Sequence, residues 1–208
     1  MIQKEDLAYL EKALLSQDID NDLNQNKYYH DDCLFDHHIL NKEFKNCYFE
    51  DCQFQDISFE NCFFIHVTFK NCDLSNIKIN ASLLRNTQFS HCKLLGTDFS
   101  ESVFDTIKIN DSICRFANFS FMKNKIVSFQ DCDLSNASII ETKLNKTHFS
   151  QCCLSQCEIL HSSLYHIDLS SCDIQNIMTS PQDISGAIID EYQAASLIHL
   201  LNVKIKDI

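Results

Sequence analysis

Cysteine and histidine are the residues of this chain that could do chemistry, because both bind metal ions and a thiolate can also act as a nucleophile or a redox centre. The 208 residues include twelve cysteines and nine histidines. The densest group is Cys152, Cys153 and Cys157. Neighbouring residues of an extended segment point in opposite directions, so these three thiols do not converge on one zinc ion. No two histidines have the HxxxH spacing of a helical zinc site.

Other catalytic patterns do not emerge from the sequence. Gly96 and Gly186 are the only glycines, so a glycine-rich phosphate loop cannot form. No nucleophile elbow, paired carboxylates or Cys/His dyad stands at a spacing that would support catalysis. The sequence therefore predicts a protein without catalytic residues, cofactor or bound metal.

Composition and charge exclude several classes of protein. Hydrophobic residues make up 45% of the chain and sixteen residues are phenylalanine, which excludes a disordered chain. The net charge of −12 argues against direct binding of nucleic acid through its phosphates. No apolar run is long enough to span a membrane, and Met1–Asp6 lacks the basic and apolar regions of an export signal. We expect a cytoplasmic protein with reduced thiols.

A five-residue period organises the chain from Leu34 to Ile174. Of the 29 residues taken at every fifth position, only Cys114 and Asn124 are not leucine, isoleucine or phenylalanine. We call these residues the centres. Neither a helix, with a period of 3.6, nor a strand, with a period of 2, accounts for this repeat. The predicted phenylalanine core consists of Phe44, Phe49, Phe54, Phe59, Phe64, Phe69, Phe89, Phe99, Phe104, Phe119, Phe129 and Phe149.

A second series lies two residues before each centre. Its 26 members from Cys47 to Cys172 are all small or β-branched except Met122. A coil with four short sides explains both series if each side is one pentad, with the centre and the residue two before it pointing inward. Asparagine or aspartate often follows two residues after the centre, as at Asn41 and Asp51, where the chain must turn a corner.

Residues twenty apart should then stack along the coil at about 4.8 Å. Nine of the twelve cysteines occupy the small inward position, where serine, threonine and alanine also occur. We therefore interpret these cysteines as small buried residues rather than as a metal or redox array. One predicted internal column contains Cys52, Cys72, Cys92, Ser112, Cys132, Cys152 and Cys172.

Several pentads resemble the A(D/N)LXX motif of pentapeptide repeat proteins. Examples are Cys72-Asp73-Leu74-Ser75-Asn76, Ala117-Asn118-Phe119-Ser120-Phe121 and Cys132-Asp133-Leu134-Ser135-Asn136. The resemblance covers roughly residues 32–189 and implies an all-β solenoid, the right-handed quadrilateral β-helix of that family, with short helices at both ends.

The sequence predicts three parts: an N-terminal helical cap and link over 1–31, the β-helix over 32–189, and a C-terminal helix and tail over 190–208. Lys4–Leu15 is predicted as an amphipathic helix, and 16–26 as a mobile link. Asp190 is a predicted N-cap and Asn202 a predicted helix end. Ala194, Leu197, Ile198 and Leu201 share one helical face that could cap the last coil. The candidate dimer interface comprises Ala194, Ala195, Leu197, Ile198, Leu200 and Leu201.

Two features of the outer surface could contact a partner. Phe63, Leu83 and Val103 lie twenty apart and one residue before their centres, which predicts an outward apolar ladder. The N-terminal helix or its link could instead cover this ladder. Asn124 is a polar centre, so we expect its side chain to bond to the backbone or to leave the core in a bulge that a partner could contact.

The C-terminal segment consists of Asp183-Ile184-Ser185-Gly186-Ala187-Ile188-Ile189, an expected helix and Val203-Lys204-Ile205. It is similar to the C-terminal module of the quinolone-resistance pentapeptide repeat proteins, which dimerise end to end there. This resemblance implies an acidic homodimeric rod that mimics duplex DNA and binds a type II topoisomerase, DNA gyrase or topoisomerase IV. Residues 1–60 carry fourteen acidic and five basic side chains, a net charge of −9, against −3 for the remainder. Two alternatives remain: a scaffold that binds another protein, and a metal-binding protein that uses exposed Cys33 and Cys153.

Overall fold

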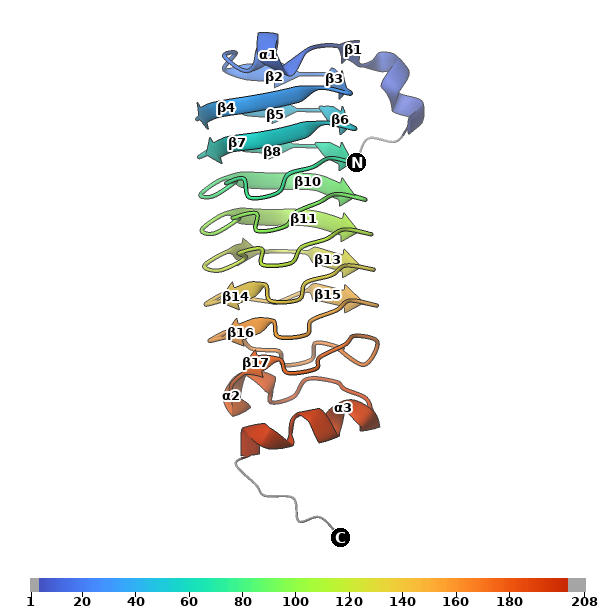
Figure 1. Ribbon diagram of the computed structural model, residues 1–208, viewed down its shortest axis with the longest axis vertical. Coiled ribbons are helices and arrows are strands. Elements are labelled where there is room, and N and C mark those ends of the chain that lie inside the picture. The colour runs from blue at the N-terminus through green and yellow to red at the C-terminus, as the bar shows by residue number, and fades with distance from the viewer. Residues whose placement is uncertain (1–3, 202–208) are drawn as a thin grey trace.

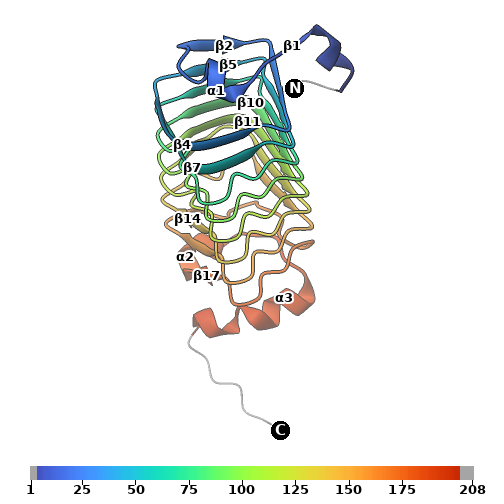
Figure 2. The ribbon, with the colours of Figure 1, turned by 45° about the horizontal axis from the view of Figure 1, so that its top comes forward.

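The molecule is a long, straight rod built from stacked coils of chain (Figure 1). The computed structural model describes residues 4–201. The N-terminal elements lie at one end of the rod, and helices α2 and α3 lie at the other end. Figure 2 shows that successive coils have the same four-sided outline and enclose one continuous interior.

Short parallel strands form most of the rod, and helical turns close its ends. The strands are β1 (Glu11–Lys12), β2 (Leu23–Gln25), β3 (Lys27–His30), β4 (Cys33–Leu40), β5 (Glu43–Lys45), β6 (Tyr48–Glu50), β7 (Gln53–Glu60), β8 (Phe63–Ile65), β9 (Thr68–Lys70), β10 (Leu83–Ser90), β11 (Val103–Asn110), β12 (Lys123–Asn124), β13 (Val127–Gln130), β14 (Ser138–Ile140), β15 (Thr147–Ser150), β16 (Glu158–Leu160) and β17 (Met178–Thr179). The helical elements are η1 (Lys4–Tyr9), α1 (Leu15–Asp18), α2 (Pro181–Ile184), α3 (Glu191–Ser196) and η2 (Ile198–Leu201), of which η1 and η2 are 3₁₀ helices.

The strand register confirms that four pentads make one coil. Leu83 pairs with Val103 and Phe89 with Ile109, so partners are twenty residues apart. The same offset joins β4 to β7 and β14 to β16. We name the four sides by their centres: side A carries Phe44, Phe64 and Phe104; side B Phe49, Phe69 and Phe89; side C Phe54, Leu74 and Cys114; side D Phe59, Phe99 and Phe119.

The interior is a set of stacked aromatic and aliphatic side chains. The rings of Phe69 and Phe89 lie 5.0 Å apart and are parallel to within 3°. Phe89 also meets Phe99 edge-on at 5.8 Å, which joins two sides of one coil. All twelve phenylalanines of the expected core are buried, and the most exposed of them, Phe149, is only 5% exposed. These contacts fill the interior of the coils with closely packed side chains.

Many of the small inward positions hold a cysteine, serine or threonine whose side chain donates to the backbone. The Cys92 Sγ donates to the carbonyls of Phe69 and Ser90, each at 3.5 Å. On side A the Ser82 Oγ makes the equivalent bonds to Phe59 and Asn80 at 3.3 and 3.1 Å. A thiol and a hydroxyl thus serve the same structural role, which explains why cysteine and serine interchange in the series. All seven members of the expected Cys52–Cys172 column are buried.

The corners have a left-handed backbone. Within residues 4–201, twenty-eight non-glycine residues have positive φ, and each of them, like Gly96 and Gly186, lies two residues after a centre or its equivalent. Asparagine and aspartate tolerate this region better than other non-glycine residues, so their recurrence there has a conformational cause.

The N-terminal region differs from the sequence expectation. The expected continuous helix over 4–15 is broken: Lys4–Tyr9 is a 3₁₀ helix, Glu11–Lys12 pairs with β3, and Leu15 begins α1. The expected link over 16–26 contains α1 and β2, and β2 pairs with β5 at the usual offset of twenty residues. Ile19, Asn24 and Tyr29 continue the series of centres backwards and are buried. The coil thus begins before residue 32, because these inward side chains already cover the first phenylalanines.

Removing one stacked ring should weaken the whole rod. We expect Phe89→Ala to lower the free energy of unfolding by about 3–5 kcal/mol, because the ring is fully buried between two others and the coil backbone cannot close the gap. Urea unfolding followed by circular dichroism measures the effect. Phe35→Ala, at a side chain that is 51% exposed, is the matched control. A loss below about 1 kcal/mol for Phe89→Ala would contradict tight packing of the column.

Burial should make most thiols unreactive. All twelve cysteines are free, and ten of them are buried, whereas Cys33 is exposed and Cys153 is half-buried. Burial raises the pKa of Cys157 to about 12, so its reactive thiolate is rare at pH 8. We expect iodoacetamide to modify Cys33 first and Cys153 more slowly, and the other ten only after unfolding. Mass spectrometry of the native protein over time tests this, and early modification of Cys92 or Cys132 would contradict it.

Candidate interaction surfaces

The predicted apolar ladder is present on side A. Phe63, Leu83 and Val103 pair in one column across β8, β10 and β11. Phe63 is 39% exposed, and the other two are half-buried. Charged residues limit the ladder at both ends, because Glu43 pairs with Phe63 and Lys123 pairs with Val103. The result is an apolar strip one residue wide and three coils long.

Asn124 does not behave as expected. It pairs in register with Phe104, so the chain does not bulge there. The Asn124 Oδ1 is buried and accepts no hydrogen bond, so the side chain is not bonded to the backbone through that atom either. The two expected solutions for this polar centre were therefore wrong. Asn124 is half-buried, which leaves it little surface for a partner.

Beyond Asn124, the backbone hydrogen bonds that join neighbouring coils of side A are interrupted. Among the described residues, no backbone hydrogen bond joins 122–125 to 142–145, or 142–145 to 162–165. Side chains connect these coils instead: the Met122 N–H donates to the Thr142 Oγ1 at 3.2 Å, and the Thr142 N–H donates to the Ser162 Oγ at 2.9 Å. The loss of the backbone ladder leaves a shallow depression on this side.

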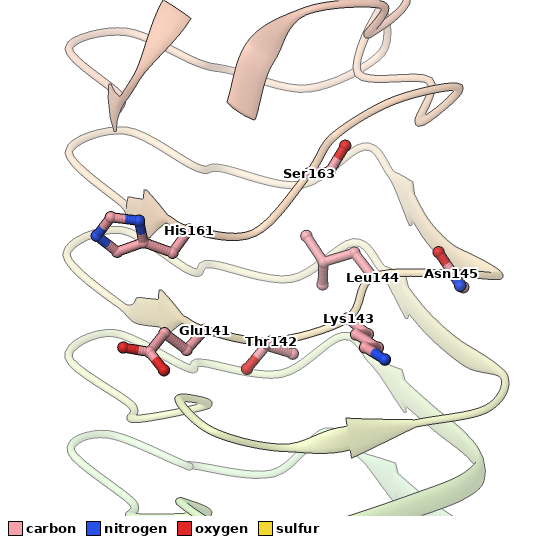
Figure 3. A pocket seen from close by; sticks show the side chains of 7 residues that line it. All are labelled: Glu141, Thr142, Lys143, Leu144, Asn145, His161 and Ser163. Carbon is pink, nitrogen blue, oxygen red and sulfur yellow. The ribbon is translucent and has the colours of Figure 1, made fainter. Parts of the chain in front are cut away.

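The depression has a volume of about 720 Å³ and is drawn in Figure 3. Its buried members are Thr142 and Leu144, and its exposed members include Glu141, Lys143 and His161. Figure 3 shows that Glu141 and His161 project at one end from two successive coils, away from Asn145. No nucleophile with a hydrogen-bonded base occurs among the residues that line it. The lining consists of Glu141, Thr142, Lys143, Leu144, Asn145, His161 and Ser163.

One group near the N-terminal end has the composition of a metal site. His30, Glu50 and Asp51 each place a ligand atom within 4.8 Å of the others. However, both Glu50 oxygens already accept hydrogen bonds, from the Tyr28 hydroxyl at 2.6 Å and from the Lys70 ammonium at 2.8 Å. The Lys70 ammonium is also the main reason that the pKa of Glu50 is lowered. These bonds are those of a structural ion pair between coils.

The two exposed cysteines cannot share a metal ion. Both lie one residue before a side C centre, but 120 residues separate Cys33 from Cys153 in the chain. That separation is six coils, or about 29 Å along the rod. The Cys153 Sγ donates to the Asp173 carboxylate at 3.8 Å. Neither cysteine occurs in a group of three possible ligands within the described residues.

The C-terminal end is capped by a polar residue that the sequence analysis did not identify. The Gln193 Nε2 donates to the carbonyls of Leu169 at 2.8 Å and Cys172 at 2.6 Å. Asp190 is the N-cap, and Asp190 and Gln193 together form a capping box. Leu197 packs against the core beside them.

The expected capping face was therefore wrong in part. Ala194 is exposed, because α3 turns Gln193 rather than Ala194 toward the last coil. Beyond Ser196 the tighter η2 helix replaces the 3.6-residue period. Among the candidate dimer residues, Ala195 is also exposed, Ile198 and Leu200 are half-buried, and Leu201 ends η2. The expected helix end at Asn202 lies outside the described residues.

Two exposed aromatic residues escaped the sequence analysis. Phe116 and Phe121 stand at consecutive corners of one coil and are 56% and 51% exposed. The sequence carried a signal for them, because phenylalanine replaces the polar residues that fill most equivalent corners.

Comparisons with known proteins agree with this architecture. The family model for the pentapeptide repeat region matches residues 42–119, and the model for eight copies of the pentapeptide repeat matches residues 127–156. No curated protein matches the sequence. No helix within residues 4–201 combines the length and apolar character needed to cross a membrane.

Solved structures with a similar fold include full-length QnrB1, a plasmid-mediated fluoroquinolone resistance protein. It is 19% identical, with 93% of this chain and 95% of that chain covered and a TM-score of 0.51. A trypsin-treated QnrB1 variant is 19% identical over 94% of this chain and 99% of that chain, with a TM-score of 0.47. A pentapeptide repeat protein from the thylakoid lumen of Arabidopsis thaliana is 21% identical over 43% of this chain and 63% of that chain, with a TM-score of 0.42.

The twenty-residue register, the left-handed corners and the two family matches together show that this chain belongs to the pentapeptide repeat family and folds as its right-handed quadrilateral β-helix.

Proposed function

We propose that this protein is a non-catalytic mimic of duplex DNA that binds a type II topoisomerase, DNA gyrase or topoisomerase IV, and protects the enzyme from fluoroquinolones or modulates it. The proposal includes a cytoplasmic location, where the enzyme acts, and a homodimer joined through the C-terminal helix. The similarity of fold to QnrB1, a fluoroquinolone resistance protein, supports this class of function.

The observation that carries the proposal is the row of carboxylates along the N-terminal coils. Asp31 and Asp51 occupy one corner column, and Asp36 and Asp56 occupy the next. Within a column, neighbouring coils repeat at about 4.8 Å, so each column places two acids side by side at one edge of the rod. These paired carboxylates present negative charge, as the phosphates of duplex DNA do.

Shape and charge together would make the rod a competitor for a basic groove. An acidic surface is attracted to lysine and arginine side chains that evolved to hold phosphates, and this attraction accelerates association. A dimer joined at the capped C-terminal ends would roughly double the length of the rod and leave both acidic N-terminal ends free. The two acidic ends could then engage both halves of a symmetric enzyme.

The carboxylates can be removed without disturbing the fold. Asp31, Asp36 and Asp56 have positive φ, a conformation that Asn41 and Asn61 adopt at other corners. We expect the triple variant Asp31→Asn, Asp36→Asn and Asp56→Asn to need about tenfold more protein for the same effect on gyrase, because it loses charge but keeps its shape. Supercoiling by purified gyrase, with and without ciprofloxacin, measures the effect.

Asp131→Asn, at a corner in the C-terminal half, is the matched control and should act like the wild type. If the wild-type protein in molar excess changes neither supercoiling nor its inhibition by ciprofloxacin, the proposed function is wrong. If the triple variant equals the wild type, the N-terminal acids are not the contact.

A scaffold that binds some other protein is the second candidate, and the apolar ladder favours it. Leu83 lies between Phe63 and Val103 at the middle of the strip. Under this alternative Leu83→Asp abolishes binding of the partner, whereas the triple asparagine variant leaves binding intact. Under the topoisomerase proposal we expect Leu83→Asp to retain its effect on gyrase. The same supercoiling assay on both variants separates the two functions.

A further inference from the structure

Two phenylalanine side chains project into solvent at consecutive corners of one coil. Phe116 stands at the corner between sides C and D, and Phe121 at the corner between sides D and A. Their exposed fractions are 56% and 51%. The two rings therefore flank side D at one level of the rod, near the middle of its length.

The backbone makes these two residues unusual. Their φ angles are 58° and 60°, a left-handed conformation that is unfavourable for a bulky side chain. Among the twenty-eight non-glycine residues with positive φ, these are the only two with a large hydrophobic side chain. Asparagine would suit both corners better, and exposed rings contribute little burial to the fold. Unfavourable backbone conformations of this kind concentrate at functional sites.

Carboxylates flank Phe121, whereas the Arg115 guanidinium lies 5.8 Å from the centre of the Phe116 ring. Glu101 and Glu141 occupy the same corner column as Phe121, one coil before it and one coil after it. Both are exposed, and neither forms an ion pair among the described residues. Asp98 lies on side D, one coil before Asn118. The Asn118 Nδ2 donates to the Asp98 Oδ1 at 3.0 Å, and Asn118 itself lies between the two corners. Side D thus combines two aromatic side chains with three acidic ones.

We propose that this face of side D, which we call the aromatic corner patch and define as Phe116, Phe121, Glu101, Glu141 and Asp98, docks into a basic protein groove of the kind that binds duplex DNA. This inference rests on the function proposed above and identifies the surface of the rod that contacts the enzyme. Aromatic side chains are enriched among the residues that dominate binding energy. The carboxylates beside Phe121 match a groove lined by lysine and arginine, which would disfavour an acidic or wholly apolar partner.

The double variant Phe116→Asn and Phe121→Asn tests the patch without endangering the fold. We expect it to bind immobilised gyrase holoenzyme at least tenfold more weakly than the wild type, because both anchors are lost. Its thermal unfolding midpoint should stay unchanged or rise, because asparagine tolerates positive φ. Tyr165→Asn, at a side chain on side A that is 61% exposed, is the matched control and should bind normally.

A second variant tests the charge. Glu101→Gln with Glu141→Gln removes two carboxylates and keeps both rings. It should also weaken binding, and its affinity should depend less steeply on salt concentration than that of the wild type.

The outcomes separate the two proposals. If the wild type does not bind gyrase at all, the proposed function and this inference both fail. If the wild type binds and the double asparagine variant binds equally well, only the inference fails. A clear fall in the unfolding midpoint of the double variant would also overturn it, because the rings would then serve the fold.

Discussion

The stacking of inward side chains at intervals of twenty residues is the interaction on which the rest of this structure depends. Each side offers one large centre and one small neighbour to the interior, and the next coil must place the same pair directly beneath them. Phe49, Phe69 and Phe89 show the result, with rings 4.7 and 5.0 Å apart and nearly parallel. A residue inserted anywhere in the coil would rotate every later side chain out of this stack. The uninterrupted period of five is therefore a requirement of the packing.

The corners follow from the same constraint. To return after four sides, the chain must turn once in every pentad, and it does so through a left-handed residue such as Asn41 or Asp51. Because the corners and two further positions of each pentad face solvent, most of the surface can vary without affecting the core. The carboxylates of the N-terminal coils and the rings of Phe116 and Phe121 occupy such positions. Function in this rod thus resides on the outside, where the stacking places no demand on side-chain type.

The sequence predicted the repeating part of the fold because the repeat leaves a regular pattern. The number of residues per coil, the buried phenylalanines and the cysteine column all follow from the positions of the centres. The ends were predicted less well, because there a single residue replaces the pattern. Gln193 caps the last coil by donating to two backbone carbonyls, and the five-residue repeat does not predict this role. Asn124 shows the same limit, since tertiary packing keeps a polar centre in register although its Oδ1 has no partner.

If the rod mimics duplex DNA as we propose, it competes with DNA for a basic protein groove. Displacement of a fluorescent DNA duplex from gyrase holoenzyme, titrated with the wild-type protein at several salt concentrations, measures this competition. We expect complete displacement, with an apparent affinity that weakens as salt rises, because both ligands are held through charge. Binding of the protein to gyrase without displacement of DNA would contradict DNA mimicry, and the absence of binding at any salt concentration would remove the topoisomerase as a partner.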